Sequence, residues 1–185
     1  MKNGVLITFV CLTLLAFCSV GSAAEKVYHL GPGDVIEISV WKDPELSRNL
    51  VVPPDGIISF PLIGPIEVAH LAIPELRKII AQKLSEFIPD ATVTVMLIEI
   101  NSLKAFVIGK VNNPGEFPIN LETNVMQILS MAGGLNPFAS EGNISILRQK
   151  DNRIIRIPFN YGQVEKGKSL EQNFILKAGD VVVVP

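Results

Sequence analysis

Cysteine and histidine are scarce in this sequence. Of its 185 residues only two are cysteines, and both, Cys11 and Cys18, lie within the first 24 residues. Without that segment the chain has no thiol, which excludes disulfide scaffolds, cysteine–zinc sites and thiol catalysis. The two histidines, His29 and His70, have no further ligand at metal-site spacing and are expected to be partly exposed structural residues.

Positive charge and aromatic rings are also in short supply. Apart from Lys2, the basic residues are outnumbered by 18 acidic ones, so nucleic acid and anionic membrane surfaces are not expected partners. Aromatic residues make up 6% of the chain, and only Tyr28, Trp41 and Tyr161 have rings with a polar edge. Trp41 ends an expected strand, and we favour a core or subunit contact for its side chain over a sugar contact.

One apolar run stands at the start of the chain. Lys2 precedes the uncharged run Val5 to Val20, and the small residues Ser22-Ala23-Ala24 follow. This order predicts a signal peptide over residues 1–24 and export to the periplasm, with outer-membrane association as an option. An uncleaved anchor is an alternative, although the run is shorter than the ~20 residues of a membrane span. Lipidation at Cys18 is a second alternative, and the bulky Phe17 before it argues against it.

The first half, residues 25–101, predicts a sheet with one helix. A strand is expected within Val27 to Trp41, and a hairpin of 50–52 with 57–60 is expected around the turn Pro53-Pro54-Asp55-Gly56. Apolar residues at spacings of three and four predict a helix from Pro74 that Pro89 stops. The strand 92–100 is expected to be buried on both faces after Met96.

The second half, residues 104–185, predicts a β-grasp-like order of strand pair, helix and strand pair. Strands are expected at 105–111 and 116–119 around an Asn-Asn-Pro-Gly turn, at 144–148 and 153–159, and at 176–184. Asn124 and Gln127 resemble a capping box for a helix that ends at Gly133-Gly134. The predicted fold class is therefore α+β with two small domains, joined near residues 101–104.

A glycine–aspartate pair precedes a β-branched strand twice, as Gly33-Asp34 in the first half and Gly179-Asp180 in the second. We interpret the pair as a repeated turn, in which glycine takes a positive φ and the carboxylate accepts hydrogen bonds from backbone amides. A metal or phosphate role for these aspartates is a minor alternative, and no cofactor is expected.

Catalytic signatures are missing from the sequence. There is no Gly-x-Ser-x-Gly elbow, phosphate loop or dinucleotide fingerprint. Carboxylates that a glycosidase would need, such as Asp43, Asp55 and Asp90, fall in expected turns, where aspartate has an ordinary structural role. The sequence is therefore interpreted as that of a protein without enzymatic activity.

Two ordered sets of motifs resemble a known family. The first set is Leu30-Gly31-Pro32-Gly33-Asp34, Trp41 with Pro44-Glu45-Leu46-Ser47, Pro54-Asp55-Gly56 and Pro61-Leu62-Ile63-Gly64. It is similar to the N-terminal domain of polysaccharide export proteins. The second set is Gly109-x-Val111-x-x-Pro114-Gly115, Ala132-Gly133-Gly134, Arg148 and Gly179-Asp180-Val181. It resembles the soluble ligand-binding β-grasp (SLBB) domain that accompanies it.

The resemblance implies a homo-oligomeric ring that conducts a polysaccharide through the periplasm above an inner-membrane polysaccharide copolymerase. The sequence departs from the family where Ala72 replaces a threonine helix cap, at a cost of about 1 kcal/mol. It also ends at Pro185, where larger members continue, so a periplasmic collar with a separate outer-membrane component is expected. A monomeric glycan-binding module and a polysaccharide-modifying hydrolase are the alternatives.

Contact residues follow from the same interpretation. Turn tips project from the sheets of a β-grasp fold, so the segments 53–56 and 112–116 are expected at subunit contacts. The candidates for subunit or polymer contact are Trp41, Pro53, Pro54, Asn113, Glu116 and Tyr161. The candidate structural turn residues are Gly31, Pro32, Gly33, Asp34, Asp55, Gly56, Pro114, Gly115, Gly133, Gly134, Gly179 and Asp180.

Overall fold

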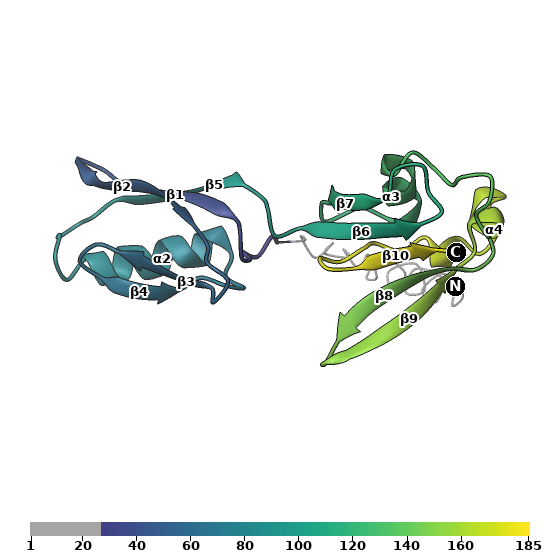
Figure 1. The fold of residues 1–185 in the computed structure, drawn as a ribbon. Coiled ribbons are helices and arrows are strands. Elements are labelled where there is room, and N and C mark those ends of the chain that lie inside the picture. The colour runs from purple at the N-terminus through teal and green to yellow at the C-terminus, as the bar shows by residue number, and fades with distance from the viewer. Residues whose placement is uncertain (1–26) are drawn as a thin grey trace, which may run out of the picture.

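The computed structural model describes residues 27–185, and the expected leader over residues 1–24 lies outside the described residues. The chain forms two lobes arranged end to end (Figure 1). We call residues 27–101 the N-terminal lobe and residues 103–185 the C-terminal lobe. Each lobe combines strands with helix around its own cluster of buried apolar residues, which confirms the α+β class.

The N-terminal lobe holds a three-stranded antiparallel sheet in the order β2 (Asp43–Val51), β1 (Val35–Val40) and β5 (Val93–Glu99). Helix α2 (Ile73–Leu84) and a small sheet of β3 (Ile57–Phe60) and β4 (Gly64–Glu67) lie on one side of it. Alternate residues of β1, beginning with Ile36, are fully buried, as are Leu76 and Ile80 of α2. The buried faces of the strand and the helix therefore pack into one core.

Two expectations for this lobe are wrong. The turn over residues 53–56 exists, with the Gly56 amide donating to the Pro53 carbonyl, but it does not close a hairpin. The strand before it pairs with β1, and the strand after it pairs with β4. The expected burial of strand 92–100 on both faces fails as well, because Met96, Ile98 and Ile100 are exposed. Only one face of β5 is covered.

The C-terminal lobe is a five-stranded mixed sheet in the order β7-β6-β10-β8-β9. Its strands are β6 (Lys104–Gly109), β7 (Gly115–Pro118), β8 (Ile144–Lys150), β9 (Arg153–Phe159) and β10 (Val181–Val184). The remaining elements are α3 (Val125–Met131), α4 (Tyr161–Glu165) and a short 3-10 helix over Leu170–Gln172. Strand β10 lies parallel to β6, and the order of elements is that of a β-grasp fold, as expected.

The helix starts follow from local capping. Asn124 accepts a hydrogen bond from the Gln127 amide at 2.9 Å, and the Gln127 side chain accepts one from the Asn124 amide at 2.9 Å, so the expected capping box is confirmed. Ala72 offers no side-chain cap to α2, and the Glu75 carboxylate instead accepts from the Ala72 amide at 2.9 Å. Several expected elements are shorter in the structure. Helix α2 ends at Leu84 before Pro89, and the last strand begins only at Val181.

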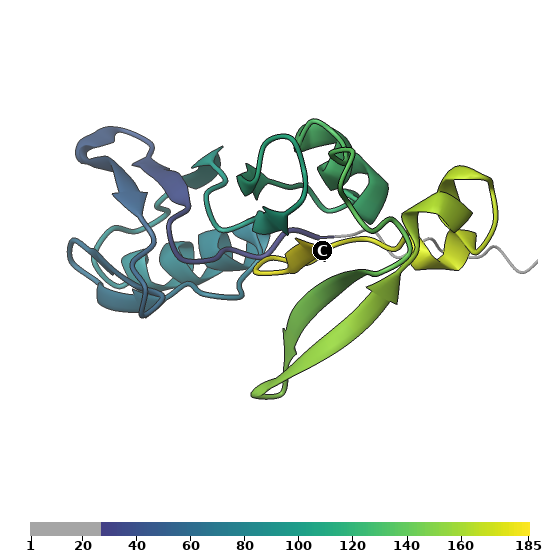
Figure 2. The ribbon, with the colours of Figure 1, turned by 45° about the vertical axis from the view of Figure 1, so that its right-hand side comes forward.

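Each large sheet has a helix on one face only. Helix α2 packs beneath the β2-β1-β5 sheet in the view of Figure 1, whereas α3 packs above the β6 end of the other sheet. The β8–β9 hairpin extends away from the body of the C-terminal lobe, as Figure 2 shows. The sheet faces opposite α2 and α3 carry no element of the described chain.

Candidate functional site

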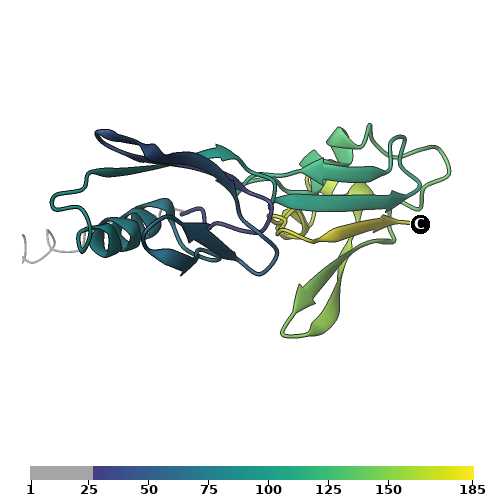
Figure 3. The same ribbon diagram turned by 60° about the vertical axis from the view of Figure 1, so that its left-hand side comes forward.

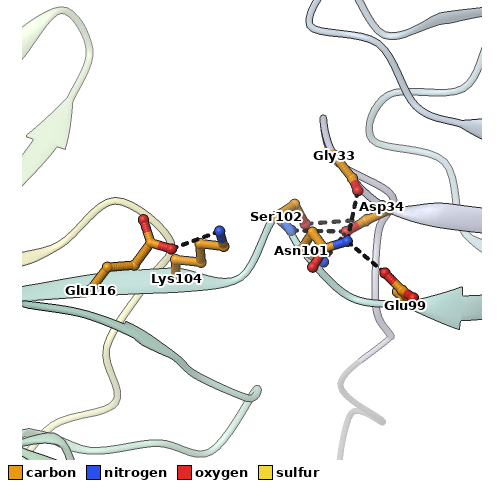
Figure 4. Close-up of polar contacts among 7 residues, drawn as sticks. All are labelled: Gly33, Asp34, Glu99, Asn101, Ser102, Lys104 and Glu116. Atoms are coloured by element: carbon orange, nitrogen blue, oxygen red, sulfur yellow. Dashed lines mark hydrogen bonds and ion pairs between the residues drawn. The ribbon is translucent and has the colours of Figure 1, made fainter.

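The junction between the lobes is organised by one buried carboxylate, Asp34 (Figure 4). Its Oδ1 accepts hydrogen bonds from the backbone amides of Asn101 and Ser102, both at 2.9 Å. Its Oδ2 accepts from the Gly31 amide at 2.8 Å. Residues 101 and 102 connect β5 to β6, so this carboxylate holds the connection between the lobes against the turn that precedes β1. Hydrogen bonds to a charged acceptor are stronger than neutral ones, which suits a fixed joint.

Two hydroxyl groups complete the shell of Asp34. The Tyr28 hydroxyl donates to Asp34 Oδ2, and the Ser102 hydroxyl donates to the same oxygen at 3.2 Å. The two hydroxyls lie 2.8 Å apart. Burial, followed by the hydrogen bond to Asp34, raises the pKa of Tyr28 to about 12. The tyrosine therefore keeps its proton and remains a donor over the whole physiological range.

The glycines of this turn are required by space and by backbone angle. A Cβ on Gly31 would lie 2.6 Å from the Cβ of Ser102, so a side chain there would push the connection away. Gly33 has a φ of 93°, which disfavours other residues. The Asn101 side-chain amide donates to the Gly33 carbonyl at 3.1 Å and to Glu99 at 3.2 Å, which ties the connection down from its other side (Figure 4).

Asp180 repeats the arrangement in the C-terminal lobe. It is buried, follows Gly179 at a φ of 81°, and accepts from the Lys177 amide at 2.8 Å, as Asp34 does from the amide three residues before it. Its other partner is Arg148 of β8, whose Nε and terminal nitrogen donate at 2.8 and 2.6 Å. The hydrogen bond to Asp180 raises the pKa of Arg148 above its already high value. The same guanidinium lies over the Phe174 ring at 5.2 Å.

The two aspartates make the hydrogen bonds expected of structural turn residues. Both carboxylates lie at the turn geometry that the sequence predicts, and their oxygens accept hydrogen bonds from amides, hydroxyls or a guanidinium. Within residues 27–185, no three histidine, aspartate or glutamate side chains are grouped as metal ligands. The lobes also meet across a mostly apolar hollow of about 340 Å³, lined by Leu97 and Ile100 on one side and Leu103 and Leu121 on the other. The junction therefore joins the two lobes through hydrogen bonds and apolar side chains.

Trp41 lies in the turn between β1 and β2. This turn is at the end of the N-terminal lobe far from the junction (Figure 1). Its side chain is 72% exposed, so it belongs to no core of the described chain. A shallow hollow of about 260 Å³ beside it is lined by Lys42, Asp43 and Thr92, among others. The role of this tryptophan as a subunit or polymer contact stays a prediction.

The other expected contact residues lie far from Trp41. The segment 53–56 links the two sheets of the N-terminal lobe, and a Cβ on its buried Gly56 would lie 2.4 Å from Ala69. The segment 112–116 joins β6 to β7, where the Asn113 amide donates to the Ala132 carbonyl at 2.9 Å. The exposed members of the expected set are Pro32, Pro54, Asp55, Asn113, Pro114, Gly115, Glu116, Gly133 and Gly179. The structure does not gather these residues into one site.

Two expected contact residues already have partners inside the chain. Glu116 forms an ion pair with Lys104 at 2.7 Å between β7 and β6. Tyr161 is half-buried at the start of α4, packs against the C-terminal core, and borders a hollow of about 410 Å³ next to Gly133 and Gly134. Sequence reasoning missed Asn101 and Ser102, which hold Asp34, and nothing in the local pattern marks them.

The exposed apolar side chains of β5 and β6 were missed as well. Met96 and Ile98 on β5, and Phe106 and Ile108 on β6, project from sheet faces that no element within residues 27–185 covers. Alternation along β6, where Ala105 and Val107 are buried between these exposed residues, carries the signal.

None of the helices within residues 27–185 is both long and apolar enough to cross a membrane.

The described chain is thus a two-lobed protein, with a sheet-and-helix lobe followed by a β-grasp lobe and a buried aspartate at the junction. Two family models match the chain, one in each half. Residues 22–98 match the polysaccharide biosynthesis/export protein model, and residues 103–184 match the SLBB domain model. The chain therefore belongs to the polysaccharide biosynthesis/export protein family, with an SLBB domain in its second half.

Curated relatives come from several bacteria. The polysialic acid transport protein KpsD of Escherichia coli is 30% identical over 128 residues, which are 69% of this chain and 23% of KpsD. The EPS I polysaccharide export outer membrane protein EpsA of Ralstonia solanacearum is 28% identical over 182 residues, covering 85% of this chain and 47% of EpsA. The capsule polysaccharide export outer membrane protein CtrA of Neisseria meningitidis is 22% identical, covering 91% and 46%. The chain spans less than half the length of these relatives.

Proposed function

We propose that this protein is a subunit of a homo-oligomeric ring that guides a capsule or exopolysaccharide chain through the periplasm. The observation that carries the proposal is the ordered pair of an export domain and an SLBB domain in one chain. The relatives are named as transport or export proteins for such polymers. Export of the chain by its leader and association with the outer membrane are part of the same proposal.

The hydrogen bonds at the junction support a role in assembly. A ring closes only when each subunit presents its contact surfaces at a fixed angle, because the same rotation is repeated at every contact. The bonds from Asp34 to Asn101 and Ser102 fix the chain where it passes from one lobe to the other. A conduit also acts through shape and weak contacts, so the proposal assigns no catalytic residue and no cofactor.

The partners of the proposed ring are the polymer in transit, an inner-membrane polysaccharide copolymerase and a separate outer-membrane component. Co-purification of the tagged protein with the copolymerase from membranes is the expected result. A variant that disrupts the ring should lose the copolymerase together with the oligomer, since the copolymerase would contact several subunits at once.

Light scattering tests the assembly. Residues 25–185 keep every residue of both cores, and their mass in solution should be measured over a series of protein concentrations. The expected result is one discrete species of many subunits. A monomer at every concentration that binds an oligosaccharide with micromolar affinity would contradict the ring and favour the alternative of a glycan-binding module.

A further inference from the structure

The uncovered face of the C-terminal sheet is apolar. Residues that alternate with the core residues of its strands project on the side opposite α3. Register places Phe106 beside Val181, Val181 beside Leu147, and Ile108 beside Val183. Ile154 of β9 continues this side of the sheet and is 70% exposed. We call these six residues the C-face: Phe106, Ile108, Leu147, Ile154, Val181 and Val183. Contiguous apolar surface of this kind marks a contact with another molecule.

The N-terminal sheet has a matching uncovered face. Val51 pairs with Val35 across β2 and β1, and Glu37 pairs with Met96 across β1 and β5. These side chains alternate with the buried residues of β1, so they project on the side opposite α2. Ile98 lies at the bulge in β5 and is 47% exposed, as is Ile108 of the C-face. We call Val35, Glu37, Val51, Met96 and Ile98 the N-face.

The two faces differ in charge. Residues 27–101 hold ten acidic and five basic side chains, whereas residues 103–185 hold seven acidic and nine basic ones. Glu37 lies in the middle of the N-face. Arg156 pairs with Leu147 and is exposed at the edge of the C-face. An apolar surface with an acidic centre thus has its complement on the other lobe, and such complementarity sets the register of an interface.

The two faces point in different directions on the molecule. Helix α2 is below its sheet and α3 is above its own in Figure 1, and Figure 3 shows the same order from another side. The N-face and C-face of one copy therefore cannot cover each other. A contact between the N-face of one copy and the C-face of another leaves one free face at each end of the pair. Such a head-to-tail contact repeats until a ring closes.

We infer that the C-face of one subunit packs on the N-face of the next, and that this contact builds the proposed ring. The inference rests on the proposed function and names its interface. The far end of the β8–β9 hairpin supports it, because residues 148–155 continue beyond the last β8–β10 pair, Leu147 with Val181. A two-stranded hairpin with isoleucine exposed is marginally stable alone and gains from being covered.

Cysteine cross-linking tests the contact directly, since residues 25–185 contain no cysteine. Ile98→Cys and Ile108→Cys are prepared separately, mixed, oxidised and separated without reductant. The mixture is expected to give a cross-linked dimer, and each variant alone is expected to give none. Phe87→Cys, at 55% exposure but outside the N-face, is the matched control and should give no dimer with Ile108→Cys.

Charge exchange provides the second measurement. Glu37→Arg alone and Arg156→Glu alone are expected to lower the assembled fraction at least tenfold at a fixed concentration, because each places like charges across the contact. The two together in one chain restore the opposite pair at every contact and are expected to recover assembly. Lys78→Glu, which reverses an exposed charge on α2 and so outside both faces, is the control and should leave the assembled fraction unchanged.

The outcomes test the proposed contact and the proposed ring separately. An oligomer in light scattering without the mixed dimer, or a dimer from Ile108→Cys alone, overturns the head-to-tail contact and leaves the ring standing. Monomers with no cross-link at any concentration overturn both. Protection of Ile108→Cys from maleimide by dextran sulfate, with no mixed dimer, would assign the C-face to an acidic polymer and also overturn the inference.

Discussion

Replacing Asp34 with alanine should weaken the whole molecule at the joint between its lobes. The substitution removes an acceptor that serves the amides of Gly31, Asn101 and Ser102. The Tyr28 hydroxyl loses its acceptor as well. Asp34 is fully buried, so its removal leaves the donors that point at it without their charged acceptor.

The size of the effect follows from these bonds. A hydrogen bond to a charged group contributes about 1.5–3 kcal/mol, and bonds that share one acceptor do not add fully. We expect Asp34→Ala to lower the free energy of unfolding by about 3–5 kcal/mol. The matched control is Asp55→Ala, which removes an exposed carboxylate with one bond of 3.1 Å to the Ile57 amide and should cost at most about 1 kcal/mol.

Urea unfolding of residues 25–185 measures both variants. With a slope of about 1–3 kcal/mol per molar urea, the midpoint for Asp34→Ala should fall by more than about 1 M. Hydrogen exchange should also become faster at the amides of Asn101 and Ser102, which are 67 and 68 residues away in sequence. Equal midpoints for the two variants, or unchanged exchange at these amides, would refute the argument that Asp34 holds the joint.

Two further predictions concern the neighbours of the buried aspartates. The pKa of Tyr28 is raised to about 12, so its contribution to stability is complete below pH 10 and is lost between pH 10 and 12. The unfolding free energy of the parent protein should therefore fall more steeply over that interval than that of Tyr28→Phe, and parallel curves would contradict this. Arg148→Ala leaves a buried carboxylate without its cation and should cost about 3–5 kcal/mol. Lys104→Ala breaks an exposed pair and should cost at most about 1 kcal/mol, so equal thermal shifts for the two would count against the distinction.

Local chemistry made much of the fold predictable. The capping box of Asn124 and Gln127 acts over three residues, and the hairpin of β8 and β9 turns at Asp151 and Asn152, both at positive φ. The glycine–aspartate turns were also predictable, because the carboxylate of Asp34 reaches an amide only three residues away. Such interactions depend on neighbours in sequence and survive in any context.

The sequence did not predict which residues distant in the chain would pair with each other. The turn over residues 53–56 has the composition of a hairpin, yet Val51 pairs back onto Val35 because β2 reaches its partner through the turn at Trp41. The other partners of Asp34 come from residues 101 and 102, which no spacing reveals. The apolar end of β5 indicated burial on both sides, and an apolar surface left for another molecule has the same composition.

The parallel pairing of β10 with β6 sets the order in which the chain completes its folding. Val181 to Val184 form the strand between β6 and β8, so the C-terminal sheet lacks its middle until residue 184 is available. The N-terminal lobe needs only residues up to Glu99 for its own sheet. A chain that emerges from a ribosome or a translocation channel with its N-terminal side leading therefore closes one lobe early and keeps the other open until residue 184 has passed. Emergence of the chain from its N-terminal side would thus separate the folding of the N-terminal lobe from that of the C-terminal lobe in time.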